Sequence, residues 1–122
     1  MLDNKLDSRA KGDKSEDLAV EYLIQKGYSI KKRNFTFGRN GEIDVIAEFK
    51  NMLIFVEVKS RYNKLGPDPI LSINYPKQKS IRKAAEGYLY VNKIENKLCR
   101  FDAILIEYDN MEPKFEHLEN MM

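Results

Sequence analysis

The chain has 122 residues and a net charge of +2, with 43% of its residues hydrophobic and 33% charged. This length is enough for one hydrophobic core, and the composition is typical of a folded globular domain and argues against a disordered chain. No apolar run approaches the roughly 20 residues that span a bilayer, and the N-terminus lacks the apolar segment of a secretory signal. We therefore expect a single domain over residues 1–122 with no membrane contact, whose core covers about 12–108 between two mobile segments, a polar N-terminus and an acidic tail.

The charge is unevenly distributed along the chain. Residues 107–122 contain five acidic residues and one lysine, a net charge of −4, so the rest carries +6. Such a basic body permits nucleic-acid binding without requiring it. The single cysteine, Cys99, cannot form an internal disulfide, which favours a cytoplasmic location, and its apolar neighbours predict a small core residue.

In chain order, the first predicted element is a helix that begins at Asp13, with Glu16 completing a capping box, and ends at Gly27. A strand over 28–35 follows. Two strong strands, 42–49 and 52–59, are then separated by only two residues, which predicts a tight hairpin. The Gly- and Pro-containing stretch 62–75 is predicted to be a loop, and loops of this length are often functional.

A second helix is predicted to start with Pro76 in its first turn, and a buried strand over 98–108 follows it. The apolar stripe of this helix consists of Ile81, Ala84, Ala85, Tyr88 and Leu89. An antiparallel hairpin followed by a helical crossover implies a mixed sheet, because the crossover returns the chain parallel to its starting strand. The sequence therefore predicts an α/β fold with a mixed central sheet flanked by helices.

Charged residues occupy one face of the predicted hairpin at its open end. A two-residue turn at Lys50 and Asn51 places Asp44 opposite Glu57 and Glu42 opposite Lys59. Two carboxylates directly across a ladder, with Cβ atoms about 5 Å apart, repel each other. The pair is tolerated if it is solvated, if it shares a proton, or if a cation lies between the groups. Mg²⁺ or Mn²⁺ would suit such oxygen ligands.

The plain alternative is a solvent-exposed face, on which glutamate and lysine are ordinary. Ile46 and Phe55 lie on the same predicted face, which favours a covering helix, and partial burial would make unpaired charge costly. The residues alone leave both interpretations open.

The arrangement Asp44…Glu57-Val58-Lys59 resembles the PD-(D/E)XK motif of restriction-endonuclease-like nucleases. Most of residues 12–106 is similar to the bacterial YraN family, which is assigned to that superfamily. Ile43 stands where the superfamily has proline. The matching segments follow the family's order over most of residues 12–106: SEDLAVEYL, RN, GEIDVIA, FVEVKSR, LG, PKQKSIRKAAEGYL and RFDAILI. The resemblance implies a restriction-endonuclease-like αβββαβ core.

The resemblance also implies roles for individual residues. Asp44 and Glu57 would be ligands of Mg²⁺ or Mn²⁺, with the Val58 carbonyl as a third, and Lys59 would orient the attacking water. Glu16 matches a carboxylate that some members direct at the same metal, although its place in a capping box explains it equally well. The implied function is that of a metal-dependent DNA endonuclease, selective for DNA structure; a junction-cutting enzyme would be a homodimer. The alternatives are a nucleic-acid-binding module with little catalysis and a small interaction protein.

Basic residues near the predicted site are candidates for phosphate contacts. Several lie in the first turns of the second helix, where cations oppose the helix dipole, so local stability does not explain them. A solvated surface remains the alternative for each. The candidate nucleic-acid-binding residues are Arg61, Lys64, Lys77, Lys79 and Lys83. Because His117 is the only histidine, a histidine-based nuclease is not expected, and no Gly-rich phosphate loop is present.

Overall fold

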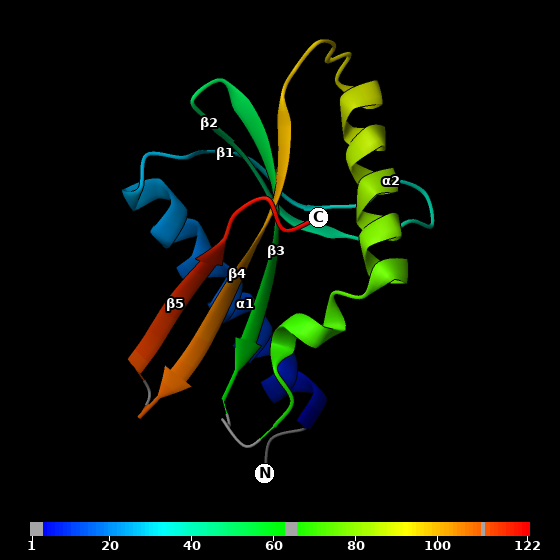
Figure 1. Ribbon diagram of the computed structural model, residues 1–122. Coiled ribbons are helices and arrows are strands. Elements are labelled where there is room, and N and C mark those ends of the chain that lie inside the picture. The colour runs from blue at the N-terminus through cyan, green and yellow to red at the C-terminus, as the bar shows by residue number, and fades with distance from the viewer. Residues whose placement is uncertain (1–3, 63–65, 111) are drawn as a thin grey trace.

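The computed structural model describes residues 4–62, 66–110 and 112–122, with side chains from residue 14 onward. One five-stranded sheet in the order β1-β2-β3-β4-β5 carries a helix on each face (Figure 1). Only β3 and β4 are parallel, and α2 forms the crossover between them. The elements are α1 (Asn4–Gln25), β1 (Ser29–Phe35), β2 (Ile43–Phe49), β3 (Met52–Arg61), the 3₁₀ helix η1 (Pro69–Ser72), α2 (Tyr75–Val91), β4 (Cys99–Asp109) and β5 (Glu112–Leu118).

This architecture confirms the predicted α/β fold with its mixed sheet and αβββαβ order, and adds β5 as a fifth strand. In the described part of the chain, neither helix has the length and apolar character needed to cross a membrane.

Helix α1 begins earlier than predicted. It starts at Asn4, so Asp13 lies inside the helix and the prediction of a capping box formed by Asp13 and Glu16 is wrong. The first turns are polar and lack the apolar period that marks a helix in sequence, so the sequence predicts only the periodic segment as helical. The predicted end is confirmed: Gly27 has a φ of +96°, and the Tyr28 amide donates to the Leu23 carbonyl at 2.9 Å.

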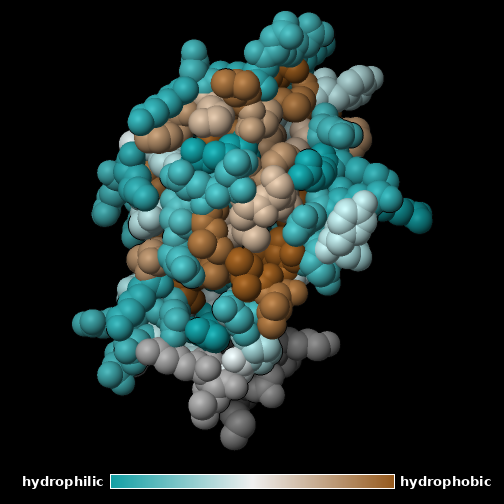
Figure 2. Space-filling view, viewed as in Figure 1, coloured by the Kyte–Doolittle hydropathy of each residue, from teal (hydrophilic) through white to brown (hydrophobic). Residues whose placement is uncertain are grey.

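Each face of the sheet is covered by one helix. On the α1 side, Ala19 and Leu23 pack on alternate residues of β2, β3 and β4. On the α2 side, the predicted stripe packs on the other set, which includes Ile46 and Phe55. Polar side chains rim the face shown in Figure 2, while apolar ones gather toward its middle. The hairpin face that carries Phe55 is therefore covered by a helix, as its apolar residues predicted. This cover partly buries the charged residues on the same face.

The hairpin turns at Lys50 and Asn51, both of which have positive φ angles of 50° and 67°. From Phe49–Met52 to Val45–Val56 the strands pair in the predicted register, but the described ladder ends there. The predicted facing positions Asp44–Glu57 and Glu42–Lys59 lie beyond this end, so they are not backbone-paired in the described ladder. The physical reason is that the Val58 amide donates to the Asp44 carboxylate (Oδ2, 2.8 Å), so a side chain takes the place of the next β2 carbonyl.

The loop between β1 and β2 is held against α2 at two points. The Gly41 amide donates to the Ser80 hydroxyl at 3.2 Å, and the Phe37 ring lies over Gly87, where any Cβ would overlap it. Because Glu42 and Asp44 follow this loop directly, these contacts fix where the charged end of β2 begins.

Strand β5 pairs with β4 and packs on α1 through Phe115, whose ring stacks on Tyr22 with centroids 5.0 Å apart. At the opposite end of β4, Cys99 is exposed, so its prediction as a core residue is wrong. Cys99 is the first residue of the strand, and the buried positions of β4 begin only at Asp102. Partial burial still raises the pKa of its thiol, which does not favour a reactive thiolate.

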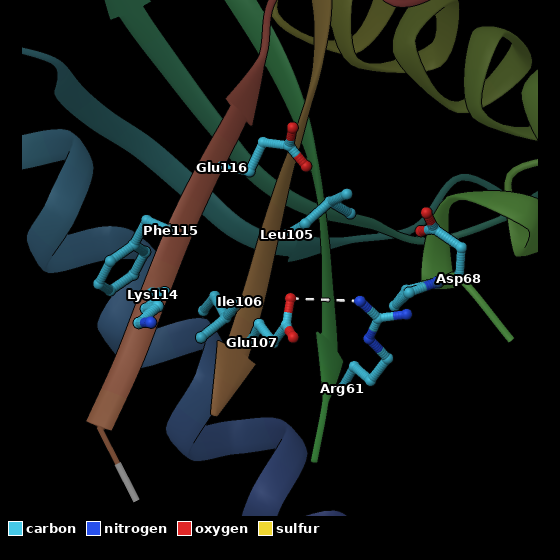
Figure 3. Close-up of a pocket in the computed structure, with 9 residues that line it drawn as sticks. Arg61, Asp68, Leu105, Ile106, Glu107, Lys114, Phe115 and Glu116 are labelled. Atoms are coloured by element: carbon cyan, nitrogen blue, oxygen red, sulfur yellow. Dashed lines mark hydrogen bonds and ion pairs between the residues drawn. The ribbon is translucent and has the colours of Figure 1, made fainter. Parts of the chain in front are cut away.

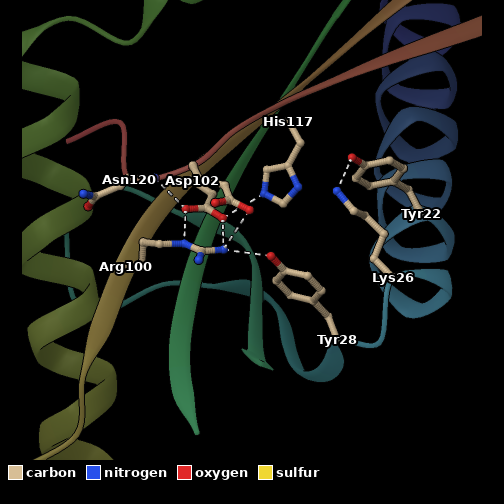
Figure 4. A network of polar contacts seen from close by, with 8 residues as sticks. Tyr22, Lys26, Tyr28, Arg100, Asp102, His117 and Asn120 are labelled. Atoms are coloured by element: carbon tan, nitrogen blue, oxygen red, sulfur yellow. Dashed lines mark hydrogen bonds and ion pairs between the residues drawn. The ribbon is translucent and has the colours of Figure 1, made fainter. Parts of the chain in front are cut away.

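A buried polar network ties β5 to β4 (Figure 4). The fully buried Asp102 carboxylate contacts the His117 ring (Nε2, 2.8 Å) and accepts two hydrogen bonds of 2.8 Å from Arg100. The Asn120 amide donates to the same carboxylate at 2.9 Å, and Arg100 also donates to the Tyr28 hydroxyl at 2.7 Å. His117 therefore belongs to a structural network that joins the acidic tail to the domain.

Candidate active site at the open end of the hairpin

Asp44 and Glu57 lie side by side where β2 and β3 separate. The Asp44 carboxylate is bound to the amide of Val58, the residue next to Glu57. The amide and carbonyl of one strand residue point toward the same neighbouring strand, so the Val58 carbonyl faces the same gap as Asp44. The structure thus brings together the three groups predicted to hold a metal, although the two strands are not backbone-paired at that point.

Glu57 is a buried carboxylate with an incomplete set of partners. It is 7% exposed, and its Oε2 atom is buried without a hydrogen-bond partner among the described residues. Burial, and after it the charge of Asp44, raises the pKa of Glu57 above its ordinary value, while Lys77 and Lys59 oppose the shift. A hydrogen-bond donor or a cation in contact with Oε2 would remove the free-energy cost of burying this oxygen without a partner.

Two further carboxylates meet Asp44. Oxygen atoms of Glu16, Glu42 and Asp44 all lie within 4.8 Å of one another, so this group could hold a metal ion. Glu16 projects from α1 with its side chain 12% exposed, and Arg33 contacts it at 3.1 Å. Burial raises the pKa of Glu16; Arg33 opposes that shift and Asp44 adds to it. With the helix start at Asn4, Glu16 is no capping residue, and its position beside Asp44 is the one that the nuclease resemblance implied.

Two lysines approach Glu57 from different elements. Lys59, on β3, places Nζ 3.9 Å from Oε1, as its alternate position on the strand predicted. Lys77, in the first turn of α2, places Nζ 4.0 Å from Oε2. Both distances exceed hydrogen-bond length, so each ammonium group lies near the carboxylate without being bound to it.

The other predicted nucleic-acid-binding residues occupy different surroundings. Arg61 lies in a polar cavity of about 380 Å³ between η1, β4 and β5, where it donates to Glu107 at 3.2 Å (Figure 3). Its guanidinium is thus engaged by an acidic side chain. Lys79 and Lys83 are exposed on the outer side of α2. Lys64 lies outside the described residues.

We call the group of Glu16, Glu42, Asp44 and Glu57 the acidic centre. Sequence reasoning did not assign Glu42 or Lys77 to it. A signal existed for Glu42, since it precedes Asp44 by two residues and shares its side of the strand. Lys77 gave only an indirect signal, a cation at a helix N-terminus, because no local pattern could place α2 beside β3.

Comparison with known proteins places this chain within a group of relatives. The profile of the family described as "Uncharacterised protein family UPF0102" matches residues 15–106, which contain every described candidate residue of the centre. A UPF0102 protein of Natranaerobius thermophilus is 39% identical over 117 residues, covering 94% of this chain and 98% of that protein. UPF0102 proteins of Clostridium kluyveri and Thermodesulfovibrio yellowstonii are 44% and 41% identical, covering 80% and 89% of this chain and 80% and 92% of those proteins.

Proposed function

The chain belongs to the UPF0102 family, which confirms its resemblance to YraN-type proteins, and from its own residues we propose that it is a metal-dependent DNA endonuclease. The observation that carries the proposal is Glu57 Oε2, which is buried near Asp44 and has no hydrogen-bond partner among the described residues. Burying Glu57 beside the half-buried Asp44 carries an energetic penalty, and divalent-ion binding would offset it.

The donor set fits a hard divalent cation such as Mg²⁺ or Mn²⁺. Asp44, Glu57 and the Val58 carbonyl would hold the ion, with Glu16 as a further carboxylate within reach of Asp44. All are oxygen donors, and the described part of the centre contains no cysteine or histidine that would favour zinc. A bound divalent ion would supply positive charge and Lewis acidity to a phosphodiester.

The chain's own residues would do the rest of the work. Lys59 can donate a hydrogen bond to the attacking water or to a phosphate oxygen, which orients the nucleophile and offsets charge on the phosphate. In hydrolysis the water oxygen forms the new bond to phosphorus while the bond to the leaving sugar oxygen breaks. The water loses a proton to solvent, and the leaving oxygen takes one up.

Nucleic acid would be bound through its phosphates. Lys79 and Lys83, exposed on one side of α2, supply charges without base-specific contacts. Selectivity for DNA structure, and a homodimer for a junction-cutting reaction, remain predictions of the same proposal. Because phosphate contacts release counterions, binding should fall steeply between low and moderate salt.

A cleavage assay tests the proposal. The full chain is incubated with duplex, single-stranded and branched DNA in the presence of Mg²⁺, Mn²⁺ or EDTA. We expect cleavage with either ion, none with EDTA, and loss of cleavage in Asp44→Asn and Lys59→Met. Salt-sensitive binding without cleavage would identify a binding module, and cleavage that persists in both variants would reject the assignment.

The metal site can be tested without a substrate. Calorimetric titration with Mn²⁺ should show binding to the wild-type chain and much weaker binding to Glu57→Gln, which keeps the side-chain shape while removing the charge. Glu95→Gln serves as the matched control, since Glu95 lies in the connection between the C-terminal end of α2 and β4, away from the centre. Equal Mn²⁺ affinity of the wild type and Glu57→Gln would contradict the metal claim.

A further inference from the structure

Lys77 is held in one position by the start of α2. Asn74 caps the helix and its side-chain oxygen accepts a hydrogen bond from the Lys77 amide at 3.1 Å. From this fixed backbone the side chain, 32% exposed, reaches inward to Glu57. The lysine therefore lies in the wall of the acidic centre, whereas Lys79 on the same helix turn is exposed.

Helix stability does not account for a lysine at this position. The first turn of α2 contains no acidic residue, and a cation there opposes the dipole of the helix. The contact with Glu57 is also too long to be a hydrogen bond, so it leaves Oε2 unsatisfied. An anion that enters the centre would give this lysine the hydrogen-bond partner that Glu57, at 4.0 Å, does not provide.

Two lysines from different elements, Lys59 on β3 and Lys77 on α2, lie beside the same carboxylate, that of Glu57. Lys59 lies 3.9 Å from Oε1 and Lys77 lies 4.0 Å from Oε2. Each ammonium group lies beside a different oxygen of Glu57, and neither is within hydrogen-bond distance of it. A tetrahedral anion has several oxygens that can be contacted from different sides, and two cations around one carboxylate suit such a group.

We propose that Lys77 is a second catalytic lysine of this centre, which contacts a non-bridging oxygen of the scissile phosphate while Lys59 contacts the attacking water. The inference rests on the proposed nuclease function and adds to it. As the water oxygen bonds to phosphorus, charge accumulates on the non-bridging oxygens, and the Lys77 ammonium group stabilises it. The remaining basic residues of α2 hold the flanking backbone.

The test compares Lys77→Met with Lys79→Met in the full chain, since both remove one charge from the same part of α2. Cleavage kinetics with Mn²⁺ separate kcat from KM, and calorimetry measures Mn²⁺ binding in the absence of DNA. Lys77→Met should lower kcat by about 100-fold with little change in KM, and Lys77→Arg should recover part of the loss. Lys79→Met should raise KM and leave kcat near the wild-type value.

Metal affinity gives a readout that does not depend on turnover. Lys77→Met removes a positive charge 4.0 Å from a proposed ligand oxygen, so Mn²⁺ should bind several-fold more tightly than to the wild type. Lys79→Met should leave Mn²⁺ affinity unchanged. If Lys77→Met fails to fold by circular dichroism, Lys77→Gln takes its place.

A Lys77→Met enzyme that resembles Lys79→Met, with raised KM and normal kcat, would overturn the inference, as would weaker Mn²⁺ binding, which would make Lys77 a support for Glu57. A wild-type chain that neither cleaves DNA nor binds Mn²⁺ would instead reject the proposed function itself.

Discussion

Gly87→Ala tests how the loop that precedes the acidic centre is seated. Gly87 lies inside α2, where alanine is normally preferred by about 0.8–1.0 kcal/mol. In this protein the Phe37 ring occupies the place of the missing side chain. An alanine would force the half-buried ring away and with it the loop that leads to Glu42.

The expected magnitude follows from two opposing terms. Displacing the ring or straining the helix costs about 1–3 kcal/mol, as overpacking does in well-packed cores, and the gain in helix propensity offsets about 1 kcal/mol of that. We expect Gly87→Ala to destabilise the protein by about 1 kcal/mol. In a Phe37→Ala background the steric term vanishes, so the same substitution should stabilise by about 1 kcal/mol.

Urea unfolding of the wild type, the two single variants and the double variant measures the effect of Gly87→Ala on the free energy of unfolding in each background. The coupling energy between positions 37 and 87 should be about 2 kcal/mol. Stabilisation of the wild-type background by Gly87→Ala, with no coupling to Phe37, would refute the reasoning and show that helix propensity alone governs the position.

Other predictions concern the polar contacts that join distant elements. Asp102→Asn should destabilise the protein by about 3 kcal/mol in urea unfolding, because Arg100 and His117 lose a buried charged partner. Burial alone would raise the pKa of Asp102, but its hydrogen bonds to His117 and Arg100 outweigh burial and lower it. This stabilisation is therefore complete above pH of about 4 and is lost as the pH falls through the folded-state pKa, so the gap between wild type and D102N should shrink in acid. Ser15→Ala should cost about 1 kcal/mol in thermal unfolding, since it removes the hydrogen bond of 2.9 Å to Tyr108.

The central hairpin could be predicted from sequence because its information is local. Two strong strands separated by Lys50 and Asn51 leave one plausible turn, and the turn fixes the register near it. The same locality brought Glu57 and Lys59 together with Asp44. The described backbone ladder ends where Asp44 itself intervenes, and a side chain that replaces a backbone acceptor leaves no periodic signal in the sequence.

The remaining features depend on tertiary packing. Strand β5 contains a proline and lies at the edge of the sheet, so its sequence reads weakly as a strand. Ser15 is buried with its hydroxyl against that of Tyr108 on β4, far along the chain, and such a contact leaves no local signal in the sequence. Lys77 reaches the acidic centre only because the crossover lays the start of α2 beside β3.

The charges at the end of β3 oppose the stability of the fold that carries them. An apolar residue at position 57 would extend the packing of Phe55 against α2, and a closer lysine would satisfy Oε2. The chain has neither; it surrounds a buried carboxylate with another carboxylate and with two cations held just beyond hydrogen-bond distance. Elsewhere in the core, the buried side chains of Ser15 and Asp102 have hydrogen-bond partners, whereas at this one place a buried carboxylate lies beside a like charge. Such a local exception within the core indicates a binding site. The two carboxylates suit a bound cation and the two lysines suit a bound anion. A divalent ion together with a phosphodiester would supply both.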